Sequence, residues 1–203
     1  MDARLLTLAV LLCWLPHGAW AGMQRSSEAL AICLLSPAAD RHSGGVVRAL
    51  SPLPDPTIFA RGDFAEIRLE QEGQVLWRRQ ADDDQPLHGP MAWPLAGLQP
   101  GQRLLLRLRP VEVGNDDFAN VELVGASADT LSRSSRLRQS LGRDPQAWLQ
   151  AVLRELEGGS SELGLALLYD FQGPSSPELN ALRREVHDRA CDAALFNADP
   201  AAR

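Results

Sequence analysis

The period of the hydrophobic pattern changes once along this chain, near residue 125, and that change limits the fold more than any other feature. Before it, apolar residues alternate with polar ones, as in "AEIRLE" at 65–70 and "RLLLRLR" at 103–109. After it, apolar residues recur every three to four positions. Alternation is typical of half-buried strands and the longer period of amphipathic helices, so the chain is predicted to form a sheet followed by helices.

A hairpin is expected where two alternating segments meet at "QEG", Gln71–Gly73. A three-residue loop that ends in glycine is typical of a hairpin with a bulge, because glycine readily adopts positive φ. A last strand is expected at "FANVELVG", residues 118–125. Several short strands without an alternating strand–helix rhythm favour a small antiparallel β-sandwich of immunoglobulin-like type.

The segment "LQPGQRLLLRLRP", residues 98–110, is predicted to be a strand with one apolar and one charged face. Leu104, Leu106 and Leu108 share a face and are assigned to the core. The arginines between them share the opposite face, where Glu66 and Glu70 are the expected neighbours. An anion-binding patch is the alternative, but a charged, half-solvated face is ordinary in an antiparallel sheet and is the preferred interpretation.

Helices are expected beyond residue 125. Asp144 is a suitable cap for the clearest of them, Pro145 is its first residue, and Gly158 ends it. In the last helix, Ser175 and Glu178 stand at capping-box spacing. The short loops predict a C-terminal cap of three or four helices. The segments with helical period are residues 129–142, 142–159, 160–171 and 175–195.

The first 21 residues have the pattern of a secretory signal peptide. An apolar run from Leu5 to Leu15 is shorter than the ~20 residues that span a bilayer, and Ala19 and Ala21 fit cleavage after Ala21. The mature protein is therefore expected to be exported, periplasmic or secreted, without a transmembrane segment. The predicted α+β organisation is a signal peptide at 1–21, an N-terminal segment at 22–45, a β-sandwich at 46–125, a helical region at 126–197 and a tail at 198–203.

The charge balance argues against nucleic acid as a partner. The chain has 20 basic and 26 acidic residues, a net charge of −6, and all of its basic residues apart from histidine are arginine. The absence of lysine excludes lysine-based chemistry, such as a Schiff base.

Two cysteines remain after cleavage of the signal peptide, Cys33 and Cys191. In an oxidising compartment they are candidates for a disulfide that ties the two ends of the chain together, which contributes about 4 to 5 kcal/mol in the chain-entropy model. Two separately buried thiols are the alternative. His187 and Cys191 are also a candidate pair of metal ligands, one helical turn apart, but zinc requires three or four ligands, so no metal or other cofactor is assigned.

Other candidate sites have ordinary structural interpretations. Acidic loops at Asp82–Asp84 and Gly114–Asp117 lack the spacing of a calcium loop and are interpreted as turns. The "RGD" tripeptide, Arg61–Asp63, is interpreted as a turn in which Gly62 is required. An arginine cluster is a candidate binding surface for an acidic surface, phosphate or polysaccharide. The alternative is a helix face that is solvated or that pairs with the acidic helices after it, which include Glu155 and Glu157. The members of the arginine cluster are Arg133, Arg136, Arg138 and Arg143.

The run from Pro56 to Val113 resembles exported cyanobacterial proteins that are uncharacterised. In them an immunoglobulin-like sheet carries a hairpin "E-x-G-x-x-x-W/Y" and a strand "L-x-x-G-x-x-Y-x-W", followed by helices. This chain departs from the pattern at Leu104 and Leu106, where that strand has aromatic residues. The resemblance implies a fold but no activity, and it transfers no site residue.

No catalytic residue is assigned. The mature chain has His42, His88 and His187 but no G-x-S-x-G nucleophile motif. The expected function is a non-enzymatic binding or structural protein of the cell envelope whose partner is a protein or an envelope component. The alternative is a metal-dependent or hydrolytic enzyme that uses His187 or His88.

Overall fold

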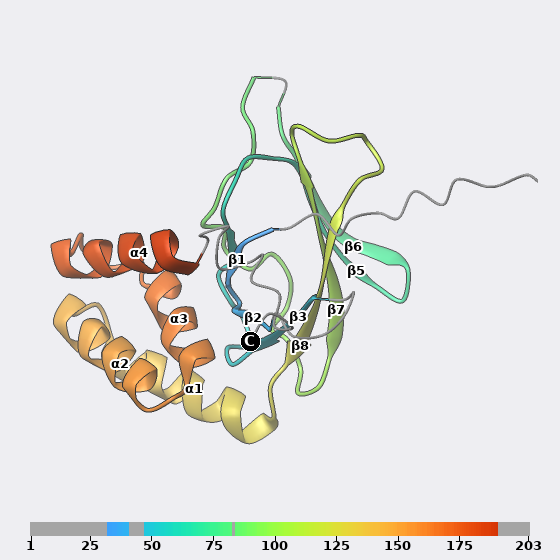
Figure 1. Ribbon diagram of the computed structural model, residues 1–203. Coiled ribbons are helices and arrows are strands. Elements are labelled where there is room, and N and C mark those ends of the chain that lie inside the picture. Colours follow the sequence, from blue (N-terminus) through green and yellow to red (C-terminus); the bar gives the residue numbers. More distant parts are fainter. Residues whose placement is uncertain (1–31, 41–46, 83, 191–203) are drawn as a thin grey trace, which may run out of the picture.

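The computed structural model describes residues 32–40, 47–82 and 84–190, and within these ranges all strands precede all helices (Figure 1). This confirms the predicted α+β class and the order of its parts. The strands are β1 (Leu34–Ser36), β2 (Ala39–Asp40), β3 (Val47–Ser51), β4 (Phe59–Ala60), β5 (Phe64–Gln71), β6 (Gln74–Gln80), β7 (Arg103–Pro110) and β8 (Ala119–Gly125). The helices are α1 (Ala128–Leu141), α2 (Pro145–Glu157), α3 (Ser161–Asp170) and α4 (Pro177–Ala190).

The strands form two sheets. A six-stranded sheet has the order β2-β3-β8-β7-β5-β6, and a two-stranded sheet pairs β1 with β4. All of these pairs are antiparallel except β3 and β8, which run parallel. An isolated bridge between Ile58 and Met91 extends the smaller layer beyond β4.

The hairpin between β5 and β6 is confirmed, with one difference in its loop. Only Glu72 and Gly73 lie between the strands, and both have positive φ, 52° and 81°. Two successive residues with positive φ are typical of a type I′ turn, whose twist matches that of the strands. The predicted bulge lies beside the turn, where the register shifts between Leu69 and Glu70.

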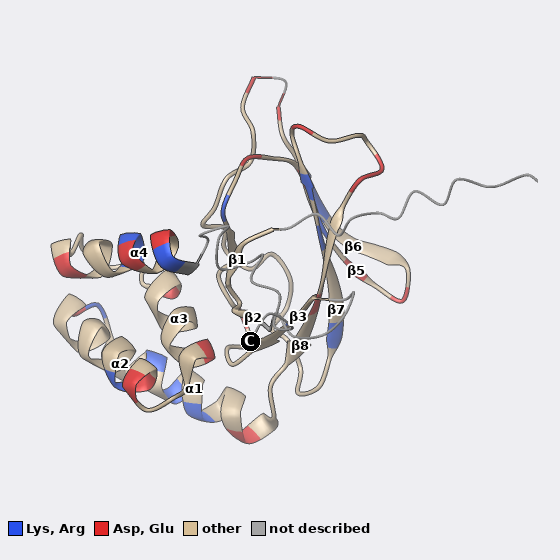
Figure 2. Cartoon of the chain, in the orientation of Figure 1, with Lys and Arg blue, Asp and Glu red and all other residues tan. Residues whose placement is uncertain are grey.

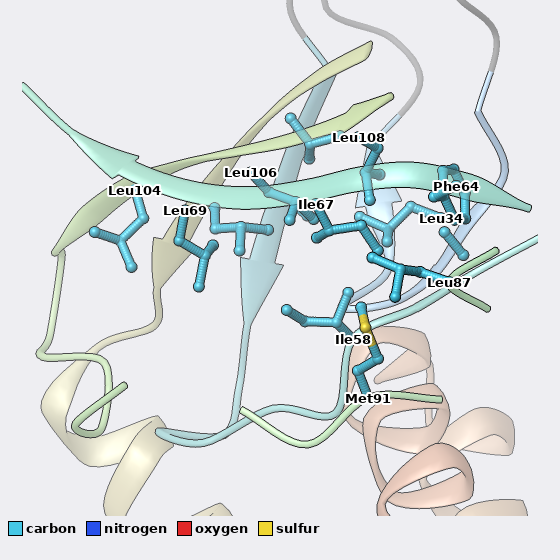
Figure 3. Packing of buried hydrophobic residues seen from close by; sticks show 14 of the residues in the cluster. Leu34, Ile58, Phe64, Ile67, Leu69, Leu87, Met91, Leu104, Leu106 and Leu108 are labelled. Carbon is cyan, nitrogen blue, oxygen red and sulfur yellow. The ribbon is translucent and has the colours of Figure 1, made fainter. Parts of the chain in front are cut away.

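The leucine face of β7 is core, as its alternation predicts. Leu104 is 3% exposed, and Leu106 and Leu108 are fully buried. Figure 3 shows these side chains directed from the large sheet towards Ile58 and Met91 of the smaller layer. The two layers therefore enclose one hydrophobic cluster, which holds the β part of the chain together.

Strand β1 separates this cluster from a second one among the helices. Successive strand residues point to opposite faces, and Leu34 joins the cluster between the sheets while Leu35 joins the helical cluster. Ile58 and Phe59 divide in the same way. Figure 1 shows β1 between the helices and the large sheet. Residues 34–40, which the sequence places in a separate N-terminal segment, therefore supply strands to both sheets.

Of the two helix caps predicted from the sequence, one is confirmed and the other is shifted by one residue. The Asp144 side chain accepts a hydrogen bond from the Gln146 amide at 3.0 Å and caps α2. In α4 the cap is Ser176, whose Oγ accepts from the Leu179 amide at 3.3 Å, so the expected cap at Ser175 is wrong by one residue. In the described part of the chain, no helix combines the length and apolar character needed to cross a membrane.

Candidate functional site

A cavity of about 620 Å³ lies where the smaller β layer meets the ends of α3 and α4. Its position follows from the fold, because residues of the β layer that point away from the sheet cluster meet the helical region there. Its lining residues are Thr57, Phe59, Pro90, Met91, Ala92, Tyr169, Phe171, Gln172, Arg183, Arg184 and His187.

Aromatic side chains form the apolar walls of the cavity. The rings of Phe59 and Tyr169 lie 4.6 Å apart between centroids at an interplanar angle of 35°. Gly89 makes room for this contact, because a Cβ there would lie 2.5 Å from Cδ2 of Phe59. Phe171 continues the wall and packs against Trp148 of α2 with a centroid distance of 5.3 Å. The walls are thus fixed by packing on both sides.

The hydroxyl of Tyr169 is buried and has no hydrogen-bond partner among the described residues. Burial raises the pKa of Tyr169 to about 12, although the nearby charge of Arg183 acts to lower it. The side chain is therefore a neutral phenol at physiological pH, able to donate one hydrogen bond and to accept another.

Arg183 of α4 fixes the end of α3 that borders the cavity. Its Nε and Nη2 donate to the Leu168 carbonyl at 3.0 and 2.8 Å, and Nη2 also donates to the Phe171 carbonyl at 3.1 Å. Carbonyls at a helix C-terminus lack partners within the helix and carry partial negative charge. Arg183 satisfies them and so joins α3 to α4.

Arg184 and His187 complete the α4 side of the cavity. They stand three residues apart, so they lie on neighbouring positions of one helix face. Arg184 is exposed, and the His187 Nδ1 lies 3.4 Å from Oδ1 of Asp188. His187, a candidate in the sequence, is therefore at the cavity, whereas its proposed metal partner Cys191 lies outside the described residues.

The four clustered arginines have different surroundings. Arg138 is half-buried, and its Nη2 lies 2.8 Å from Oδ1 of Asp55 while its Nη1 lies 3.5 Å from Oδ2 of Asp170. It therefore links α1 to the β layer and to α3. Arg133, Arg136 and Arg143 are exposed.

A polar groove of about 460 Å³ lies along the loop between β6 and β7. His88, Asp82 and Asp84 of this loop are among its lining residues. The groove meets the cavity at Pro90–Ala92, which line both. Figure 2 shows acidic residues on this loop and on the loop between β7 and β8 at the same end of the β part. Within residues 32–40, 47–82 and 84–190, no three histidine, cysteine or acidic side chains are grouped to hold a metal ion.

The charged face of the large sheet has the predicted pairing. Arg107 Nη1 lies 3.4 Å from Oε1 of Glu70, and Arg109 Nη2 lies 3.5 Å from Oε2 of Glu66. The ring of Phe118 covers part of this face, with the Arg107 Cζ 4.6 Å from its centroid. Glu66 is therefore only 3% exposed, which is more burial than a half-solvated face predicts.

The cavity itself was not predicted. Its aromatic walls come from β4 and from the end of α3, and neither segment carries a motif. The one available signal was the alternation at Ile58 and Phe59, which implies that Phe59 needs cover from a second layer. Comparison of the chain with protein-family models, curated proteins and solved structures finds no match.

Proposed function

We propose that this chain is an exported, non-enzymatic binding protein that holds an apolar ligand in the cavity between its smaller β layer and its helices. The cavity carries the proposal. Its volume of about 620 Å³ falls within the range of about 300 to 1,000 Å³ that is usual for small-molecule sites. Ligand sites commonly combine apolar walls with a few polar groups at a junction between structural layers, and this cavity has both features.

The fold of the β part supports an immunoglobulin-like assignment, which is part of the proposal. Immunoglobulin-type sandwiches have one sheet with the order G-F-C-C′. Strands β8, β7, β5 and β6 follow that order along the large sheet. Strands β1 and β4 then stand for the opposite sheet, reduced in size and covered on its outer face by the helices.

Export rests on residues 1–21, which lie outside the described residues. Their short apolar run and the alanines before Gly22 support cleavage by a signal peptidase. The resemblance of residues 56–113 to exported cyanobacterial proteins fits the same compartment. We propose the cell envelope as the site of action.

The surroundings of the histidines support binding over catalysis. Among the described residues, neither His88 nor His187 hydrogen-bonds a serine, threonine or cysteine side chain that it could activate. The contact of His187 is with Asp188, which is exposed. The cavity walls beside His187 are apolar and aromatic, which suits retention of a ligand.

Titration of the mature chain with the neutral fluorescent probe N-phenyl-1-naphthylamine tests the proposal. We expect saturable binding at one site, weakened by about tenfold or more in Ala92→Phe, because the larger side chain occupies cavity volume. Ala96→Phe is the matched control, since Ala96 is exposed in the same connection and does not line the cavity. Equal affinities of the probe for the wild-type chain and Ala92→Phe, or no saturable binding, would contradict the proposal.

A further inference from the structure

The described cavity lining carries basic side chains and no acidic ones, beside the neutral polar residues Thr57 and Gln172. Arg183, Arg184 and His187 all line it from α4, and none of the described lining residues is an aspartate or a glutamate. The chain as a whole has a net charge of −6, so this local balance runs against its composition. A cleft with low-dielectric walls and charges of one sign attracts ligands of the opposite sign.

Carboxylates of α3 and α4 have partners of their own, and Glu185, the chain neighbour of Arg184, faces Arg189 at 2.9 Å. Asp170 lies beside Thr57 of the cavity wall, but its Oδ2 faces Arg138 at 3.5 Å. Asp188 lies beside His187 and is exposed. Neither carboxylate contacts Arg184, and within the described ranges Arg184 forms no ion pair. A guanidinium group can bind an oxyanion through two parallel hydrogen bonds.

A buried hydroxyl lies behind the aromatic wall of the cavity. Tyr169 is only 5% exposed, lines the cavity and has no hydrogen-bond partner for its hydroxyl among the described residues. Buried hydroxyls nearly always have a partner, since leaving one without costs free energy. The hydroxyl is enclosed by protein atoms, so a ligand in the cavity meets the ring of Tyr169 and not its hydroxyl.

We infer that the ligand is an amphipathic anion of the fatty-acid type, with its alkyl chain against the wall formed by Phe59, Tyr169 and Phe171 and its carboxylate beside Arg184 and His187. This inference rests on the proposed function and adds the class of ligand. The aromatic walls can pack against an unbranched alkyl chain, because such a chain has no polar groups that need hydrogen-bond partners. The carboxylate stays at the edge of the cavity that α4 forms, where it is hydrated and lies beside the Arg184 guanidinium.

Three single-chain amphiphiles of equal length separate the contributions of chain and charge. Binding of dodecanoate, dodecanol and dodecylamine to the mature chain is measured by displacement of N-phenyl-1-naphthylamine at neutral pH. We expect dodecanoate to bind about tenfold tighter than dodecanol, because a charge-assisted pair with Arg184 adds to the same apolar contact. Among saturated carboxylates we expect the affinity to rise by up to about fourfold for each added methylene until the chain fills the cavity.

Variants of α4 locate the carboxylate. Arg184→Gln is expected to remove most of the preference for dodecanoate over dodecanol while leaving the affinity for dodecanol within about twofold. Arg189→Gln is the matched control, because Arg189 is on the same helix, exposed, and outside the cavity. Circular dichroism of each variant confirms that the fold is unchanged.

The outcomes separate this inference from the proposed function. If dodecanol or dodecylamine binds as tightly as dodecanoate, the cavity is an apolar site without anion recognition and the inference is overturned. It is equally overturned if Arg184→Gln and Arg189→Gln have the same effect, or if a short apolar peptide with a free carboxyl terminus binds tighter than dodecanoate. If neither the probe nor any amphiphile binds, the proposed function fails as well.

Discussion

Arg138 of α1 lies between two carboxylates from different parts of the fold, with its Nη2 2.8 Å from Oδ1 of Asp55. Its second partner, Asp170, ends α3, and the Asp170 side chain is 12% exposed. Burial raises the pKa of the Asp170 carboxyl, although the charge of Arg138 acts to lower it. One guanidinium thus joins α1 to the β layer and compensates a buried acid.

Arg138→Ala is therefore expected to destabilise the chain by about 2 kcal/mol, because it leaves the Asp170 carboxylate buried without its counter-charge. Urea unfolding followed by circular dichroism measures the change. Arg133→Ala, on the exposed side of the same helix, is the control and is expected to change stability by less than about 0.5 kcal/mol. Equal losses in the two variants would show that Arg138 does not hold the helices to the sheet.

Glu66 predicts how stability changes with pH. Burial acts to raise the pKa of the Glu66 carboxyl, but the hydrogen bond and charge of Arg78 and the charge of Arg68 outweigh it and hold the pKa below the ordinary 4.5. A lowered pKa in the folded state stabilises the fold above pH 4.5, and that contribution is lost as the pH falls through the folded-state pKa.

Glu66→Gln should accordingly flatten the acid side of the stability profile. The free energy of unfolding, measured between about pH 3 and pH 7, is expected to fall less steeply with decreasing pH in the variant than in the wild type. Asp170, whose raised pKa acts in the opposite direction, is common to both proteins and cancels in the comparison. Glu157→Gln, exposed on α2, is the control. Parallel profiles for wild type and Glu66→Gln would refute this role of Glu66.

The N-terminus of α4 gives a prediction in which structure and sequence pattern disagree. Ser176→Ala removes the hydroxyl that accepts from the Leu179 amide and should destabilise the chain by about 1 kcal/mol. Ser175→Ala leaves that cap intact and is expected to cost less than about 0.5 kcal/mol. Thermal unfolding of both variants checks the difference, and a larger loss in Ser175→Ala would restore the capping box suggested by the sequence.

The disulfide between Cys33 and Cys191 stays a prediction, because Cys191 lies outside the described residues. Cys33 packs against the helical cluster, to which Val186 of α4 also belongs, and α4 ends one residue before Cys191. We expect the purified protein to be lighter than its reduced form by the mass of two hydrogen atoms. Peptide mapping should find the two cysteines linked. Alkylation of both thiols without prior reduction would contradict the pairing.

The sequence predicts the features of this fold that depend on local pattern. Period-two alternation placed Leu106 in the core and Arg107 on the opposite face, and positive φ at Gly73 followed from its place between two strands. These predictions hold because a strand has only two faces and a tight turn accepts few residues. The cap of α4 was missed because Ser175 and Ser176 are adjacent and both have the right chemistry.

The cavity depends on contacts that no local pattern contains. Phe59 and Tyr169 meet because the small sheet of β1 and β4 lies between the two hydrophobic clusters. Leu34 of β1 belongs to the cluster between the sheets, and Leu35 belongs to the helical cluster. Which strand is covered by helices is decided by packing of the whole chain. Periodicity shows that a side chain needs cover, but it does not show which segment supplies it. Arg138 illustrates the same limit. The sequence pattern placed it in an exposed basic cluster, whereas in the fold it pairs with Asp55 and Asp170.

Photo-crosslinking with a dodecanoate that carries a diazirine group tests the central claim most directly, because it reports where a ligand lies. After irradiation of the mature chain, peptide mapping is expected to find the label on residues that line the cavity, in segments 57–59, 90–92 and 169–172, with excess unlabelled dodecanoate preventing the reaction. Label concentrated elsewhere, such as on the groove between α2 and α4 that Leu153 and Leu182 border, would contradict the account.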